Sequence, residues 1–173
     1  MVYVVLEMNV SCIPRKHGVY ALVIELSRNV ELNIGKLGRH GLLKGVYVYI
    51  GSARSRGGLF VRVKRHLRKL KTLRWHIDYL TVLSECNIRA VIYAITDDVE
   101  AESTISRILY RHPYFKPTIK RFGSSDKRDY THLYRCIKDL DICINSLLQV
   151  FSKANMTPGI CYATDLLTGV KEE

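Results

Sequence analysis

The sequence predicts a small α/β protein of the α+β kind, with helices flanking a central mixed β-sheet. Segments rich in β-branched and aromatic residues, as strands are, occur at residues 18–26, 46–50 and 87–96. Segments with apolar residues at helical spacing occur at residues 59–73, 99–110 and 139–153. We interpret residues 1–137 as the main domain and residues 138–173 as a C-terminal helical extension with a tail.

Shorter elements are expected between these segments. Additional short strands are predicted at residues 2–6, 30–34, 118–122 and 133–137. Gly35, Gly38, Gly41 and Gly45 predict an irregular connection. The predicted helix over 59–73 carries one apolar stripe, formed by Leu59, Val63, Leu67 and Leu70. Asp97 or Asp98 is expected to cap the helix that follows.

The composition is that of a globular protein. The chain has 173 residues, of which 47% are hydrophobic and 25% are charged, so it is long and apolar enough to bury a core. No apolar run approaches the roughly 20 residues that span a bilayer. Residues 1–7 lack the features of a signal peptide. We therefore expect a cytoplasmic protein.

The net charge points to a polyanionic partner. With 27 Lys and Arg against 16 Asp and Glu, the charge is +11, and nucleic acid is the first candidate. The residues expected to contact phosphates are Arg54, Arg56, Lys64, Arg65, Arg68, Lys69, Lys71 and Arg74. A membrane surface is the second candidate, but no basic amphipathic helix carries Trp and Phe on its apolar face. A basic protein without an anionic partner is the remaining alternative.

The cysteines predict neither a zinc site nor a disulfide framework. Their number is odd and none are spaced as C-x-x-C: Cys12, Cys86, Cys136, Cys143 and Cys161. We expect reduced, mostly buried thiols.

Five residues supply the chemistry needed to hydrolyse a phosphodiester: Tyr20, Tyr49, Arg62, His66 and Glu102. Tyr20 and Tyr49 lie on predicted strands, and Arg62 and His66 share one face of a predicted helix because they are four residues apart. A carboxylate binds a hard cation, an arginine stabilises phosphoryl charge, and a histidine or tyrosine positions or deprotonates water. Each residue alone has an ordinary structural explanation, so the interpretation depends on their order.

That order resembles a known family. Gly18-Val-Tyr20 and Tyr49-Ile-Gly51 resemble the two signature triplets of the GIY-YIG nuclease superfamily, and Glu102 resembles its metal-binding glutamate. Further segments resemble a mostly archaeal branch labelled as a domain of unknown function: residues 35–38, 57–59, 74–80, 122–126 and 132–133. The resemblance covers about residues 16–137.

The resemblance implies a role for each residue. Tyr20 would be the general base or hold the attacking water, and Tyr49 would bind the phosphate or assist that water. Arg62 would neutralise developing charge, and His66 would orient Tyr20 or transfer a proton. Glu102 would hold one Mg²⁺ or Mn²⁺ ion. Because the usual pKa of tyrosine is about 10, we expect Arg62 and the metal to lower the pKa of Tyr20.

Two positions depart from the family pattern. The asparagine that follows the glutamate in many members is missing between Glu102 and Phe122, so Ser124, Ser125 or Asp126 is the candidate replacement. Lys127 stands where the branch often has a cysteine.

Three further residues are candidates for a supporting role. In an extended segment His76 and Asp78 would point the same way, either as a second polar cluster or as a structural hydrogen bond above Trp75. We favour the structural interpretation. His132 is the third supporting candidate.

These observations predict a metal-dependent endonuclease that cuts DNA, rather than RNA, in a branched or damaged form. The first alternative is a catalytically inactive nucleic-acid-binding protein, with RNA or the ribosome as partner, that retains the fold. The second is a protein-interaction module that docks through the predicted helix over 139–153.

Overall fold

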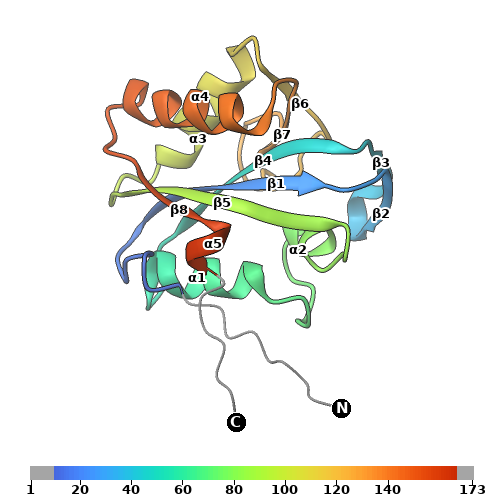
Figure 1. Ribbon diagram of the computed structural model, residues 1–173, viewed down its shortest axis with the longest axis horizontal. Helices are drawn as coiled ribbons and strands as arrows, with labels where there is room; N and C mark the ends of the chain where they lie inside the picture. Colours follow the sequence, from blue (N-terminus) through green and yellow to red (C-terminus); the bar gives the residue numbers. More distant parts are fainter. Residues whose placement is uncertain (1–9, 167–173) are drawn as a thin grey trace.

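The computed structural model describes residues 10–166, so the strand expected at residues 2–6 lies outside the described part. Within it, a six-stranded sheet lies between two layers of helices (Figure 1). The strands are β1 (Gly18–Leu26), β4 (Gly45–Ala53), β5 (Cys86–Ile95), β6 (Phe115–Pro117), β7 (Leu133–Cys136) and β8 (Gly159–Tyr162). The α+β class is therefore confirmed.

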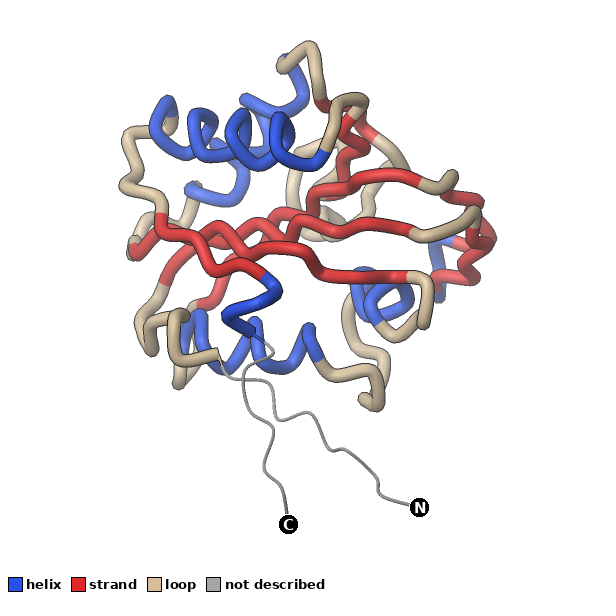
Figure 2. Tube along the Cα trace, viewed as in Figure 1, coloured by secondary structure: helices blue, strands red, loops and turns tan. Residues whose placement is uncertain are grey.

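The helices divide between the two faces of the sheet. One layer contains α1 (Gly58–Leu67), α2 (His76–Thr81) and α5 (Ala163–Leu166), and the other contains α3 (Ala101–Arg111) and α4 (Leu140–Lys153) (Figure 2). Strand β1 contributes side chains to the hydrophobic core on each face of the sheet. Its Tyr20, Leu22 and Ile24 belong to the core under α1 and α2, whereas Val19 and Ala21 belong to the core under α3 and α4. This alternation follows from the two-residue period of a strand.

The strand order is β6-β7-β4-β1-β5-β8, and every pairing is antiparallel. The expectation of a mixed sheet was wrong in this respect. Strands β4 and β5 do run in the same direction, since both pair antiparallel with β1. However, β1 lies between them, so the helical connection from β4 to β5 creates no parallel pairing.

Several local expectations need correction. The glycine-rich connection is a short 3-10 turn (Gly35–Leu37) followed by strand β3 (Gly38–Leu42), which pairs with β2 (Val30–Ile34). The expected strand over 118–122 is absent from the described chain, and β6 precedes it. Arg74 to Leu80 is also not extended throughout, because α2 begins at His76.

The first helix ends at Leu67 rather than at residue 73, and Leu70 is 94% exposed. The Lys71 ammonium donates hydrogen bonds to the carbonyls of Arg65 and His66, at 3.2 and 2.9 Å. Carbonyls at a helix C-terminus lack partners within the helix, so a lysine that turns back onto them terminates it.

The segment after residue 137 is more than a helical extension. Its helix α4 buries Cys143, Leu147 and Phe151 in the main core, and its strand β8 pairs with β5 at the sheet edge. Among residues 10–166, no helix is long and apolar enough to cross a membrane.

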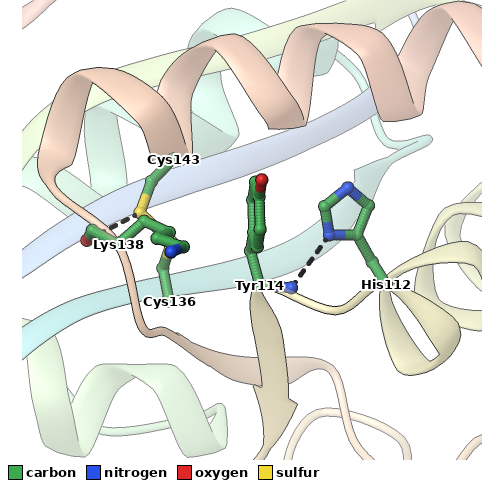
Figure 3. The surroundings of a disulfide bond; sticks show 5 residues. All are labelled: His112, Tyr114, Cys136, Lys138 and Cys143. Carbon is green, nitrogen blue, oxygen red and sulfur yellow. Dashed lines mark hydrogen bonds between the residues drawn. A yellow bond between two sulfur atoms is a disulfide. The ribbon is translucent and has the colours of Figure 1, made fainter.

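The expectation of reduced thiols was wrong for four of the cysteines. Cys12 is bonded to Cys161, and Cys136 is bonded to Cys143, which leaves Cys86 as a buried free thiol. Figure 3 shows the second disulfide, between the end of β7 and the first turn of α4. Disulfides are typical of oxidising compartments and of intracellular proteins of hyperthermophiles.

Candidate active site

One cavity of about 390 Å³ brings together the five residues of the predicted site. It is lined by Tyr20, Tyr49, Gly51, Ser52, Arg54, Arg62, His66, Trp75, Val99, Glu102, Gly123, Asp126 and Lys127. The cavity lies where β1 begins and β4 ends. Helix α1 supplies Arg62 and His66 from one face of the sheet, and α3 supplies Glu102 from the other.

Tyr20 and His66 form a buried pair at the base of the cavity. The Tyr20 hydroxyl lies 2.7 Å from Nε2 of His66, and the two residues are 2% and 1% exposed. Nδ1 of His66 has no hydrogen-bond partner in the described structure. Gly51, opposite Tyr20 on β4, makes room for this pair, because a Cβ there would lie 2.4 Å from the Tyr20 hydroxyl.

Burial keeps this pair uncharged. It raises the pKa of Tyr20 well above its usual value, and the nearby Arg62 guanidinium only partly opposes that increase. Burial also lowers the pKa of His66 to about 3, and Lys71 adds to the effect. Arg62 lowers the pKa of Tyr20 as expected, but burial outweighs it, so the pKa is raised. The cost of charging a buried phenol exceeds the attraction of one guanidinium.

Tyr49 lines the same cavity beside Gly123. Burial raises the pKa of Tyr49, and the negative charge of Glu102 raises it further. Gly123 has a φ of +73°, and a Cβ there would lie 2.8 Å from the Tyr49 ring. A glycine therefore allows the backbone of residues 122–124 to cross close to this tyrosine.

Trp75 orients the arginines of α1. The guanidinium carbons of Arg62 and Arg65 each lie 4.1 Å from the centre of the Trp75 ring, a distance suited to cation–π attraction. Arg65 also donates two hydrogen bonds to buried Asp78, at 2.7 and 2.8 Å. In contrast, Arg62 forms no ion pair with any described residue, so its guanidinium is available to an anion in the cavity.

Glu102 is held by partners on three sides. Its carboxylate accepts a hydrogen bond from Ser52 at 3.0 Å and lies 3.1 Å from the Lys127 ammonium. Its other oxygen lies 3.0 Å from Nδ1 of His132, whose Nε2 is 3.0 Å from Asp129. Burial alone would raise the pKa of Glu102, but His132 and Lys127 lower it.

His132 lies between the carboxylates of Glu102 and Asp129. Burial alone would lower its pKa, yet the carboxylates of Glu102 and Asp129, each beside one ring nitrogen, raise it. His132 was expected among the supporting residues, whereas Ser52 and Asp129 were not. The spacing of Asp129 and His132, three residues apart, was a usable signal, whereas the pairing of Ser52 with Glu102 depends on the fold.

Glu102 is the candidate ligand for the single divalent ion that the resemblance implies. No group of three or more His, Cys, Asp or Glu residues that could hold a metal occurs within residues 10–166. Glu102 offers an anionic oxygen at the cavity wall, which is the kind of ligand with which Mg²⁺ retains several waters. The Lys127 ammonium lies beside that oxygen and must move aside for an ion to bind there.

Comparison with known protein families identifies a family that matches most of this chain. A domain of unknown function, DUF123, matches residues 19–155. The chain belongs to this family. Comparisons with curated proteins and with solved structures gave no match. The matched range includes all of α4, so the DUF123 domain extends beyond residue 137 and contains the first part of the expected extension.

The basic stretch of the DUF123 domain separates into two groups. Arg65, Lys69 and Lys71 are engaged by other groups of the protein: Lys69, although exposed, donates hydrogen bonds to the carbonyls of Thr81, Leu83 and Cys86. We therefore reassign these three residues from phosphate contact to structural roles. The other exposed members remain candidates for phosphate contact: Arg54, Arg56, Lys64, Arg68 and Arg74. Arg54 also donates to the carbonyl of Asp97 at 3.0 Å, beside the cavity.

The expected hydrogen bond between His76 and Asp78 is not formed. Nδ1 of His76 accepts a hydrogen bond from the Gly123 amide at 3.0 Å, while Asp78 binds Arg65. The helical turn at α2 explains the difference, because residues two apart on a helix point to different sides.

The residues proposed to replace the missing asparagine occupy different environments. Ser124 is buried and donates to the Asp129 carbonyl at 3.0 Å. Ser125 is exposed, and of the three residues only Asp126 lines the cavity with Glu102.

Proposed function

We propose that the DUF123 domain is a metal-dependent endonuclease of the GIY-YIG kind that hydrolyses phosphodiester bonds in DNA of a branched or damaged form. The observation that carries this proposal is the hydrogen-bonded pair of Tyr20 and His66 in the same cavity as Glu102 and the unpaired Arg62. This combination offers a proton acceptor, a phosphate-binding cation and an anionic oxygen for a metal. We also propose that the protein acts in the cytoplasm.

The Tyr20–His66 pair suggests a proton path that avoids a free phenolate. Water transfers a proton to the Tyr20 oxygen as Tyr20 transfers its own proton to Nε2 of His66, which is 2.7 Å away. The resulting hydroxide attacks phosphorus, and the bond from phosphorus to the leaving oxygen breaks. The bound phosphate offsets the positive charge of nearby Lys71 and Arg62, which favours the imidazolium during this step.

The remaining residues bind the substrate and stabilise charge. Arg62, oriented by Trp75, binds the non-bridging phosphate oxygens, and Tyr49 donates a hydrogen bond to the same group. Glu102 would hold a Mg²⁺ or Mn²⁺ ion, which would supply stabilisation of negative charge on the leaving oxygen. The leaving oxygen takes up a proton from solvent, and His66 releases its extra proton through Tyr20 to solvent, so that both residues return to their starting state.

The test is Glu102→Gln. The uncharged amide is a weak ligand for a hard cation, so cleavage should fall by at least about a hundredfold while DNA affinity stays nearly unchanged. Cleavage is measured with Mg²⁺ or Mn²⁺ on duplex, flap, junction and RNA substrates. Glu100→Gln is the matched control, because Glu100 is an exposed acid at the start of the same helix and lies outside the cavity.

Arg62→Ala should differ from Glu102→Gln by losing affinity together with cleavage, because Arg62 contacts the phosphate in both the ground and transition states. Equal cleavage rates for the parent and Glu102→Gln at the same metal concentration would show that Glu102 is not part of the catalytic site.

A second candidate function is a nucleic-acid-binding protein without catalysis, including one that binds RNA or the ribosome. The contact between Lys127 and Glu102 favours it, because the ammonium already neutralises the carboxylate that would bind metal. Binding by both the parent and Glu102→Gln, with no cleavage of any substrate by either, would select this alternative.

A further inference from the structure

A second cavity lies next to the candidate active site, on the other side of the segment 126–130. Its volume is about 210 Å³, and its walls come from α3 and from residues 128–134. Tyr134 forms the floor, where its buried hydroxyl lies 2.7 Å from that of Ser106. Asp126 and Lys127 line the first cavity, whereas Arg128 and Tyr130 line the second.

The second cavity exposes a pair of aromatic rings. The rings of Tyr110 and Tyr130 have their centres 6.0 Å apart with 51° between their planes, yet the residues are 51% and 42% exposed. The pair therefore keeps apolar ring surface in contact with solvent. Exposed aromatic rings in a basic groove are the usual platform on which unpaired bases stack, because every base has a flat π surface.

Unpaired guanidinium groups surround these rings. Arg111 and Arg128 line the cavity and have no hydrogen-bond or ion-pair partner in the described part of the chain. Arg107 lies 3.6 Å from Asp129 and 3.5 Å from Glu100, so it is partly neutralised. An adjoining cavity of about 320 Å³ also contains Arg107 and Arg111, together with Lys153. The positive surface therefore continues beyond the tyrosine pair.

The distance between Glu102 and the tyrosine pair determines how many nucleotides of a DNA strand would lie between them. Glu102 and Tyr110 lie on the same helix, eight residues apart, which corresponds to about 12 Å along its axis. A strand in duplex DNA advances about 3.4 Å per nucleotide, so at most roughly three or four nucleotides of a more extended unpaired strand span this separation. A strand with its scissile phosphate at Glu102 would thus reach the tyrosines within a few nucleotides.

We propose that the cavity of Tyr110, Tyr130, Arg111 and Arg128 binds an unpaired nucleotide of the substrate strand, with the base on the tyrosine rings and the flanking phosphates on the arginines. The inference rests on the proposed function and narrows its substrate to DNA that has a single-stranded segment beside the cut. A paired base cannot stack on the rings, because both of its faces are covered in the duplex.

Affinity for single strands tests the stacking. Fluorescence anisotropy is measured with a labelled single-stranded DNA, the same sequence as a duplex, and the same sequence as RNA. Replacing both tyrosines (Tyr110→Leu with Tyr130→Leu) should weaken single-strand binding about tenfold or more, whereas phenylalanine at both positions should preserve it. Duplex affinity should change by less than about twofold, since a duplex offers no unpaired base to stack. The RNA arm shows whether the site also accepts a ribose.

A separate pair of variants tests the contribution of the arginine charges to single-strand binding. Arg111→Gln should weaken single-strand binding and reduce its salt dependence by about one phosphate contact. Lys36→Gln removes an equal charge from an exposed turn outside both cavities and should leave binding nearly unchanged.

Photocrosslinking locates the base directly. An oligonucleotide carrying 5-iodouracil should crosslink to peptides that contain Tyr110 or Tyr130, as identified by mass spectrometry. Single-strand affinity unchanged in the double leucine variant, or crosslinks confined to other residues, would overturn the proposal.

The two proposals fail in different ways. Suppose that the parent cuts DNA and that the double leucine variant binds single strands and cuts DNA as well as the parent does. This inference then fails and the nuclease proposal stands. If the parent binds single strands through the tyrosines but cuts nothing, the nuclease proposal fails while the binding site stands. If the parent binds no nucleic acid, both fail.

Discussion

At neutral pH, Tyr20 and His66 face each other as two uncharged groups. This state follows from burial, which disfavours the phenolate of one and the imidazolium of the other. A tyrosine in such an environment is a poor base on its own. In the proposed mechanism it relays a proton only because a neutral imidazole nitrogen lies within hydrogen-bond distance.

Tyr20→Phe tests this relay. The variant keeps the ring that packs against His66 but loses the hydroxyl, so cleavage should fall by about 10²–10⁴-fold, the usual contribution of general base catalysis. DNA affinity should be retained, because Arg62 and the exposed lysines and arginines are unchanged. Single-turnover cleavage and anisotropy are the two measurements. A variant that cuts as fast as the parent would exclude Tyr20 as the proton acceptor.

Under the proposed function, Lys127 would compete with a metal ion for Glu102. We expect Lys127→Met to raise the affinity for Mn²⁺ by about fivefold, since the ammonium no longer neutralises the carboxylate, an effect of about 1 kcal/mol for a partly exposed pair. Calorimetric titration of Mn²⁺ into the protein without DNA measures this. Lys120→Met, an exposed lysine with no described partner, is the control. Weaker Mn²⁺ binding by Lys127→Met would show that Lys127 assists the ion instead.

The junction of α1 and α2 gives the cavity one of its walls. Buried Asp78 accepts hydrogen bonds from Arg65 and from the amides of Arg74 and Trp75, at 2.8 and 3.0 Å for the amides. Burial alone would raise the pKa of Asp78, but these donors lower it to about 2. One carboxylate thus orients Trp75, which in turn orients Arg62 over the cavity.

Asp78→Asn should therefore be strongly destabilising. Removing the charge leaves the buried Arg65 contact uncompensated, which typically costs about 3–5 kcal/mol. Urea unfolding measures the change in the free energy of unfolding. Glu31→Gln is the control, because Glu31 pairs with Arg39 on the surface and such pairs contribute about 1 kcal/mol or less. Similar losses in the two variants would contradict the structural role of Asp78.

The two disulfides act over very different lengths of chain. Cys12 and Cys161 are 149 residues apart and connect the loop before β1 to the edge strand β8. Cys136 and Cys143 are only 7 residues apart and connect β7 to α4. A crosslink over a longer loop removes more entropy from the unfolded chain.

We expect Cys12→Ser to reduce the free energy of unfolding by up to about 5 kcal/mol, compared with about 2 kcal/mol for Cys136→Ser. Denaturant unfolding of the oxidised proteins measures both values. Reduction with dithiothreitol should lower the free energy of unfolding of the parent. The unfolding free energies of the three proteins should then be more similar than those of the oxidised proteins. Equal stability of the oxidised and reduced parent would contradict this expectation.

Most elements of the fold were predictable from local patterns. The strands β1 and β5 and the helix α4 follow from side-chain periodicity and residue type, which act over a few neighbouring residues. The order of Tyr20, Tyr49, Arg62, His66 and Glu102 along the chain predicted a shared site, and the structure places all five around one cavity. Their chemical roles remain predictions.

Other features depend on contacts between segments that are distant in the sequence, so no local sequence pattern predicts them. The end of α1 is set by Lys71 turning back on it, and the directions of Lys69 and Arg65 depend on α2 and β5. Cys12 meets Cys161 because β8 pairs with β5. The pKa values of Tyr20 and His66 likewise depend on how completely the fold excludes water from them. Burial is a property of the packed chain, so the residue types were readable from the sequence, whereas their partners and charge states required the tertiary structure.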